Sequence, residues 1–89
     1  MNEKQLIYDE IISKYKFNDK QKIEIKLGIE SKIDVSVYAK PEFDEFQMFQ
    51  IYEGLIRGFD VSVYAKPEIK WNEMRKILWA MEDELKAKK

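Results

Sequence analysis

The side chains in this sequence that could perform acid–base or metal chemistry are carboxylates, and they gather in short runs. Paired carboxylates can exchange protons with a substrate or bind a hard cation when they converge in a pocket. The same residues are also typical of solvated helix faces and of first helical turns, where negative charge is favourable. The runs are Asp9-Glu10, Glu42 with Asp44-Glu45, and Glu82-Asp83-Glu84. Their pattern favours a solvated surface over a catalytic pair.

Composition narrows the chemistry further. The 89 residues include no histidine and no cysteine, which removes the commonest general base, the commonest zinc ligand, thiolate chemistry and disulfides. No phosphate-binding glycine loop, nucleophile elbow or metal-ligand spacing occurs. We therefore expect a non-enzymatic protein with no cofactor, no metal site and no small-molecule substrate.

A tyrosine and a lysine recur together, as Tyr38 with Lys40 and as Tyr64 with Lys66. Such a pair could bind nucleic acid, because lysine contacts the phosphate backbone while an aromatic ring stacks on a base. Glu42 follows the first lysine, however, and the chain has a net charge of −1, so nothing favours nucleic acid globally. The other interpretation is that both tyrosines are core residues and both lysines are solvated.

The two pairs belong to an exact repeat that organises the chain. Asp-Val-Ser-Val-Tyr-Ala-Lys-Pro-Glu occupies residues 34–42 and again residues 60–68, an offset of 26 residues. Extending this period predicts one domain over residues 1–89, made of units 8–33, 34–59 and 60–85. A unit of this size cannot bury its own apolar face, so neighbouring units must supply the core.

Hydrophobic spacing and capping residues predict helices. We expect them over about residues 3–15, 19–31, 44–57 and from about residue 70 to the C-terminal end. Asn18 with Gln21 and Asp44 with Gln47 form capping boxes, and Gly58 is a left-handed helix end.

The repeated nonapeptide allows two interpretations. Asp34 and Asp60 are good N-caps, which favours one to two helical turns ended by Pro41 and Pro67. The alternation of Val35, Ser36 and Val37 would also suit a small pair of strands. We favour helix, so the predicted fold is all-α: a miniature helical solenoid or bundle of three units, each with a short helix followed by a long one.

Some columns of the repeat keep one character, which indicates the core. Apolar residues recur at the columns of Ile25, Ile29, Ile33 and Phe17, and we expect Leu85 in the core by the same rule. Gly28, Gly54 and Ala80 share another column. A glycine inside a helix costs about 1 kcal/mol relative to alanine, so its recurrence predicts a close approach by a neighbouring element.

Other columns change from unit to unit and form a stripe at helical spacing on each long helix. Large aromatics beside an arginine are common anchors of protein interfaces, although the stripe could instead pack between units. The candidate partner-binding residues are Phe46, Phe49, Glu53, Ile56, Arg75 and Trp79; the alternative nucleic-acid contacts are Lys40 and Lys66.

Residues 34–55 read Asp-Val-Ser-x-Tyr-Ala-x-Pro-x-Phe-Asp-x-x-Gln-Met-x-x-Ile-x-x-Gly-Leu. This motif resembles tandem repeats in uncharacterised proteins of gut-type Gram-positive bacteria and their mobile elements. The match is weaker in the last unit, where Ile69, Lys70, Glu73 and Ala80 depart from it, and weaker still in the first. The resemblance implies a small cytoplasmic protein from a phage or conjugative element, and it implies no activity.

Together these observations predict a protein–protein interaction module. Its partner would be a host factor that it binds and inhibits or modulates, or a second copy of itself. An anti-CRISPR-like role against host defence is one form of this function, and it follows from the context alone. Nucleic-acid binding is the alternative. The N-terminal residues lack a signal-peptide pattern and no apolar run is long enough to span a membrane, so we expect a cytoplasmic location and no membrane partner.

Overall fold

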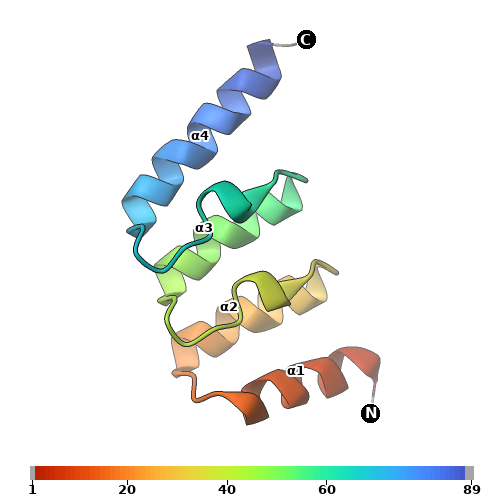
Figure 1. Ribbon diagram of the computed structural model, residues 1–89. Coiled ribbons are helices and arrows are strands. Elements are labelled where there is room, and N and C mark those ends of the chain that lie inside the picture. Colours follow the sequence, from red (N-terminus) through yellow and green to blue (C-terminus); the bar gives the residue numbers. More distant parts are fainter. Residues whose placement is uncertain (1, 88–89) are drawn as a thin grey trace.

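A computed structural model describes residues 2–87, and this part of the chain is all-helical. The elements, in order, are α1 (Glu3–Lys14), α2 (Asp19–Glu30), η1 (Val35–Val37), α3 (Glu45–Ile56), η2 (Val61–Val63) and α4 (Trp71–Ala87), where η marks a 3-10 helix. Residues 2–87 contain no β-strand, so the alternative of a small strand pair is wrong. In Figure 1, α2, α3 and α4 run in the same direction and follow one another in a row, and α1 precedes them in the opposite direction.

Local hydrogen bonds set the helix starts, as the sequence predicts. The side chains of Asn18 and Asp44 each accept a hydrogen bond from the backbone N–H three residues later. In turn, the Oε1 atoms of Gln21 and Gln47 accept hydrogen bonds from the backbone N–H groups of Asn18 and Asp44. Both capping boxes are therefore confirmed.

Helices α2 and α3 end in the same way, although their residues differ. Gly58 has a φ of 75°, and the Phe59 N–H bonds to the Gly54 carbonyl, which is the Schellman arrangement. At the end of α2 the left-handed position is held by Lys32, with a φ of 62°. A side chain at this φ is unfavourable, so the end of α2 carries strain that the end of α3 avoids.

The nonapeptides are helical, but each forms a single 3-10 turn. Asp34 and Asp60 cap these turns through the N–H groups of Ser36 and Ser62. The turn of η1 ends at Tyr38, three residues before Pro41. The prediction that the prolines end the short helices is therefore wrong, because the residues just before each proline already lie outside the 3-10 turn.

The first unit differs from the predicted short helix followed by a long one. Helix α1 has 12 residues, as many as α2 and α3. Tyr8 stands at the position that the N-cap Asp34 holds in the next unit, and tyrosine is not an N-cap residue, so α1 runs through this position and ends at Lys14 with Tyr15 as its C-cap. A continuous helix is the result.

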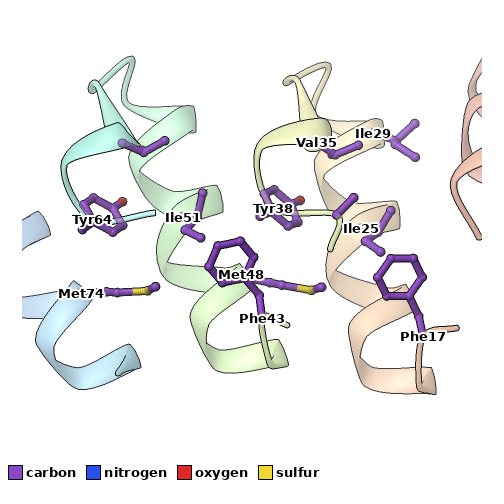
Figure 2. Packing of buried hydrophobic residues seen from close by; sticks show 12 residues of the cluster. Phe17, Ile25, Ile29, Val35, Tyr38, Phe43, Met48, Ile51, Tyr64 and Met74 are labelled. Carbon is purple, nitrogen blue, oxygen red and sulfur yellow. The ribbon is translucent and has the colours of Figure 1, made fainter. Parts of the chain in front are cut away.

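The core lies between the row of long helices and the 3-10 turns (Figure 2). Tyr38, Tyr64, Ile25, Met48 and Ile51 are all fully buried. The predicted core position Leu85 is instead 50% exposed, because no further unit covers that side of α4 within the described residues.

The structure confirms the prediction that a neighbouring element comes close to Gly28 and Gly54. A Cβ atom on Gly54 would lie 2.6 Å from Val61 Cγ1 and would also overlap the Tyr64 hydroxyl; Gly28 meets Val35 and Tyr38 in the same way. The Tyr64 hydroxyl passes the glycine and donates a hydrogen bond of 2.7 Å to the Gln50 carbonyl inside α3. Close approach of a 3-10 turn to a helix therefore explains both glycines. Ala80, which no such turn contacts in the described chain, is exposed.

A glutamine in α2 and another in α3 join their helix to the loop that precedes the next long helix. Gln21 Nε2 donates hydrogen bonds to the carbonyls of Phe43 at 2.7 Å and Pro41 at 3.3 Å. Gln47 Nε2 makes the same contacts with Ile69 at 2.7 Å and Pro67 at 3.0 Å. One glutamine side chain thus closes the cap of its own helix and holds a loop 20 to 22 residues ahead.

Candidate protein-binding face

The repeated tyrosines lie in the core. Tyr38 and Tyr64 have no exposed surface, and burial raises the pKa of both hydroxyl groups well above the ordinary value for tyrosine. Their rings cannot stack on a base. Lys40 and Lys66 are exposed, so the interpretation of core tyrosines beside solvated lysines is confirmed.

The carboxylate runs do not converge. Within residues 2–87, no group of three or more acidic side chains is placed to hold a metal ion. Burial, and secondarily the charge of Glu45, raises the pKa of Glu24. The sequence did not identify Glu24, because its environment between α2 and α3 depends on packing. A single carboxyl with a raised pKa does not make a catalytic pair.

One broad surface carries large exposed apolar side chains. We call it the outer stripe and define it by the residues at four equivalent columns of α2, α3 and α4. These residues are Lys20, Ile23, Leu27, Glu30, Phe46, Phe49, Glu53, Ile56, Asn72, Arg75, Trp79 and Glu82. Their spacing of three, four and three residues places each set on one face of its helix.

On α3, the Phe49 position of the outer stripe faces away from the 3-10 turn η2. Gly54, which contacts η2, follows Phe49 by five residues, and at 3.6 residues per turn the two positions are roughly 140° apart around α3. The alternative that the stripe packs between units holds in part, because Phe46 contacts Trp71 of α4, yet the large side chains of the stripe keep exposed surface. Phe46 is 56% exposed, Trp79 51% and Ile56 48%, whereas Phe49 is 38% exposed.

Neighbouring side chains hold these residues in place. The rings of Phe46 and Trp71 are 5.9 Å apart between α3 and α4, and the Arg75 guanidinium lies 4.6 Å from the centre of the Trp79 ring. An arginine over a tryptophan face is a favourable cation–π contact. The arrangement presents apolar surface in a defined conformation.

Ion pairs border the same surface. Arg57 contacts Glu53 at 2.9 Å and Glu82 at 3.8 Å, which links α3 to α4. A groove of about 240 Å³ lies among Phe49, Glu53, Arg57, Arg75 and Trp79, together with Gln50 and Leu78. Four of the six candidate partner-binding residues thus line one groove, and Phe46 and Ile56 lie on the same face of α3.

Sequence reasoning missed two members of this surface. Trp71 is 38% exposed and contacts Phe46, but its column holds Asp19 and Glu45 in the other units, so the repeat gave no signal for it. Arg57 was assigned only to the end of α3. Its pairing with two stripe carboxylates depends on how α4 packs on α3.

A larger groove of about 470 Å³ lies between α1 and the segment that contains the end of α2 and η1. Its apolar lining includes Ile7, Ile11, Ile29 and Ile33, and charged residues of both signs surround it. Because α1 is a full helix, it does not pack on η1 closely. No buried polar group points to a particular ligand here.

No helix among residues 2–87 combines the length and apolar character needed to cross a membrane. Comparison with known protein families, with curated protein sequences and with solved structures finds no match for this chain.

Proposed function

We propose that this protein is a non-enzymatic protein–protein interaction module that binds through the outer stripe. The observation that carries the proposal is the exposure of Phe46, Phe49, Ile56 and Trp79 on one face. Contiguous exposed apolar surface on a small protein commonly marks an interaction site, and aromatic residues with arginine are its usual anchors.

The scaffold of the module is a stack of three helical units, 8–33, 34–59 and 60–85, within one domain. Two observations support this arrangement. The glutamine contacts to the following loop occur after both α2 and α3. The contact of tyrosine with a helix carbonyl 14 residues earlier also occurs twice. In such a stack the core columns hold neighbours together, which leaves the outer columns free to vary with the partner.

The biological setting of the proposal comes from the resemblance of residues 34–59 to repeats of Gram-positive bacteria and their mobile elements. A small cytoplasmic protein of a phage or conjugative element would use such a face to bind and inhibit a host factor, as an anti-CRISPR protein does. Nucleic-acid binding has less support, since the tyrosines that would stack on bases are buried.

Variants that remove the aromatic anchors test the proposal. Phe49→Ser and Trp79→Ser should leave the melting temperature within a few degrees, because both side chains are substantially exposed, yet they should abolish association. Ile51→Ser is the matched control: Ile51 is fully buried on the same helix as Phe49, so its loss should cost about 2–5 kcal/mol.

The measurements are thermal melts, sedimentation, and capture of binding proteins from a Gram-positive lysate at several salt concentrations. If Phe49→Ser and Trp79→Ser both unfold the protein, the outer stripe is core and the proposal is wrong. If both variants fold and bind like the wild type, the binding surface lies elsewhere. Retention of nucleic acid that weakens steeply with salt would instead support the nucleic-acid alternative.

A further inference from the structure

The outer stripe is complementary to itself when two copies meet with antiparallel helices. We infer that the partner of this face is a second copy of the chain, in a two-fold dimer whose axis runs along the row of helices. This inference rests on the proposed function, because it names the partner of the same face. It follows from the order of charged and apolar residues along each helix.

Helix α2 shows the pattern most simply. From its start to its end, the outer stripe reads Lys20, Ile23, Leu27 and Glu30. When a second α2 lies antiparallel across it, Lys20 faces Glu30 of the partner subunit and Ile23 faces Leu27 of the partner subunit. Opposite charges therefore meet at both ends, and apolar side chains meet in the middle. Ile23 is 64% exposed and Leu27 36% exposed, so both are available.

The same two-fold axis pairs the other two helices, since the repeat holds the columns in register. On α3, Phe46 faces Ile56 of the partner subunit. Two apolar side chains, 56% and 48% exposed, would thus be buried together.

On α4, Arg75 faces Trp79 of the partner subunit, a second cation–π contact in addition to the one within each chain. Asn72 meets Glu82 of the partner subunit, and on α3 Phe49 meets Glu53 of the partner subunit. No pair in this arrangement opposes two like charges.

The parallel arrangement of the same faces is unfavourable. A two-fold axis along the helices would place Glu53 against the partner's Glu53 and Glu30 against the partner's Glu82. Like charges brought together at an interface can cost several kcal/mol, so charge pattern selects the antiparallel dimer.

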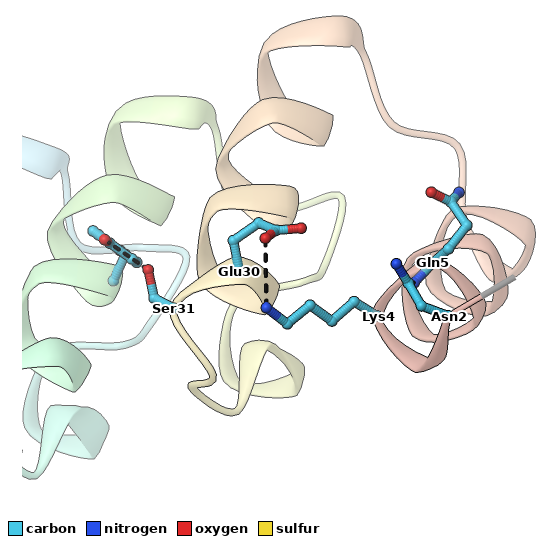
Figure 3. A network of polar contacts seen from close by, with 6 residues as sticks. Asn2, Lys4, Gln5, Glu30 and Ser31 are labelled. Carbon is cyan, nitrogen blue, oxygen red and sulfur yellow. Dashed lines mark hydrogen bonds and ion pairs between the residues drawn. The ribbon is translucent and has the colours of Figure 1, made fainter.

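The stripe charges already have partners within the chain. Lys4 Nζ lies 3.5 Å from Glu30 (Figure 3), Lys20 lies 4.0 Å from Glu45, and Arg57 contacts Glu82. These pairs are at least partly exposed, and such pairs contribute about 0–1 kcal/mol. These ion pairs within the chain can persist beside the contacts between subunits, or they can break and re-form when the second copy binds.

The face is large enough for a specific dimer. The molecule measures 44 by 27 by 17 Å, so its broad side exceeds the roughly 800 Å² per partner that a standard interface buries. The large exposed side chains that the outer stripe offers to such an interface are Ile23, Phe46, Ile56 and Trp79.

Sedimentation equilibrium tests the dimer through its charge pairs. The wild type should show a concentration-dependent monomer–dimer equilibrium. Lys20→Glu creates two contacts between like charges and should weaken the dimer at least about tenfold. The double variant Lys20→Glu/Glu30→Lys exchanges the charges and should restore most of the affinity. Thermal melts of both variants check that they are folded. A wild type that stays monomeric, or a double variant no better than the single one, overturns the proposal.

Cross-linking tests the antiparallel register, and the chain suits it because it has no cysteine. Positions 20 and 30 are ten residues apart, or roughly 15 Å along a helix. A bis-maleimide reagent shorter than that distance should join the Lys20→Cys variant to the Glu30→Cys variant in a mixture. Neither variant should cross-link to itself. Self-linking of either one would contradict the antiparallel register.

These results separate the dimer from the broader function. A monomeric wild type that captures another protein in a manner dependent on Phe49 and Trp79 refutes the dimer and retains the interaction module. A dimer that survives both Phe49→Ser and Trp79→Ser refutes the outer stripe as its interface and, with it, this inference.

Discussion

Replacing Gln47 with glutamate tests the contact by which one helix holds the next loop. The substitution preserves shape and keeps the oxygen that accepts a hydrogen bond from the Asp44 N–H at 2.9 Å. It removes the Nε2 donor that serves the carbonyls of Ile69 and Pro67. The residue is only 6% exposed, so water cannot readily substitute for the lost donor.

The expected cost follows from these contacts. Each lost hydrogen bond contributes about 1 kcal/mol, and a carboxylate held against two carbonyl oxygens adds a desolvation and repulsion term of similar or larger size. We expect Gln47→Glu to lower the free energy of unfolding by about 2–4 kcal/mol at pH 7. A chain of this length has roughly 4–13 kcal/mol in total, so the loss should be plain.

The loss of unfolding free energy in Gln47→Glu should increase as the pH rises. Burial and the two carbonyls raise the folded-state pKa of the introduced carboxyl above its unfolded value of about 4.3. The neutral acid can donate one hydrogen bond to a carbonyl. Its contribution to stability is therefore fully present below the unfolded-state pKa of the carboxyl group and is lost as the pH rises through the folded-state pKa. The difference from wild type should therefore be largest at pH 7 and should shrink toward pH 4.

Urea unfolding followed by circular dichroism at several pH values measures both effects. The matched control is Glu73→Gln, the same column in α4, where the side chain forms an exposed ion pair with Lys76 at 3.6 Å and holds no loop within residues 2–87. That exchange should change stability by less than about 0.5 kcal/mol. If Gln47→Glu costs no more than the control, or if its cost is constant with pH, the amide does not hold the loop as we describe.

Further substitutions probe the close contacts and helix ends. Gly54→Leu should lower stability by about 1–3 kcal/mol, because the new side chain must displace Tyr64 and Val61; a rise in melting temperature would show instead that only helix propensity matters there. Lys32→Gly should raise stability by roughly 1 kcal/mol in urea titrations, since it relieves the left-handed position at the end of α2; an unchanged midpoint would contradict that strain. Stability should fall above about pH 10, because burial raises the folded-state pKa of Tyr38 and Tyr64 and the contribution of their neutral forms is lost as the pH rises. Replacing both tyrosines with phenylalanine should flatten this decline, and a decline equally steep in that variant would assign it to other groups.

Most of the local structure could be predicted from the sequence. The capping boxes at Asn18 and Asp44 and the left-handed end at Gly58 depend on hydrogen bonds between residues three to five positions apart. Residue identity at those positions is enough to establish such bonds, whatever the rest of the fold does. The helical state of the nonapeptide followed from its capping aspartate in the same way.

The reason for the glycine column could be predicted only in outline. A mid-helix glycine at the repeat period indicated that something comes close, but the sequence did not say what. The structure identifies it as a tyrosine hydroxyl and a valine from the next 3-10 turn, which also explains why alanine is tolerated at position 80. The glutamine contacts escaped prediction for the same reason: they join residues 20 and 22 positions apart.

The sequence identified the residues of the outer stripe but could not determine whether they are exposed. Variation between units identified the columns of Phe46, Phe49 and Trp79, but a variable column can pack between units or face outward. Only the packed structure separates these two outcomes, because exposure depends on which side of α3 the turn η2 covers and on how α4 packs against α3. Capping and helix formation are local, so the sequence determined them; burial is a property of the assembled helices, so the tertiary structure determined which side chains remain exposed.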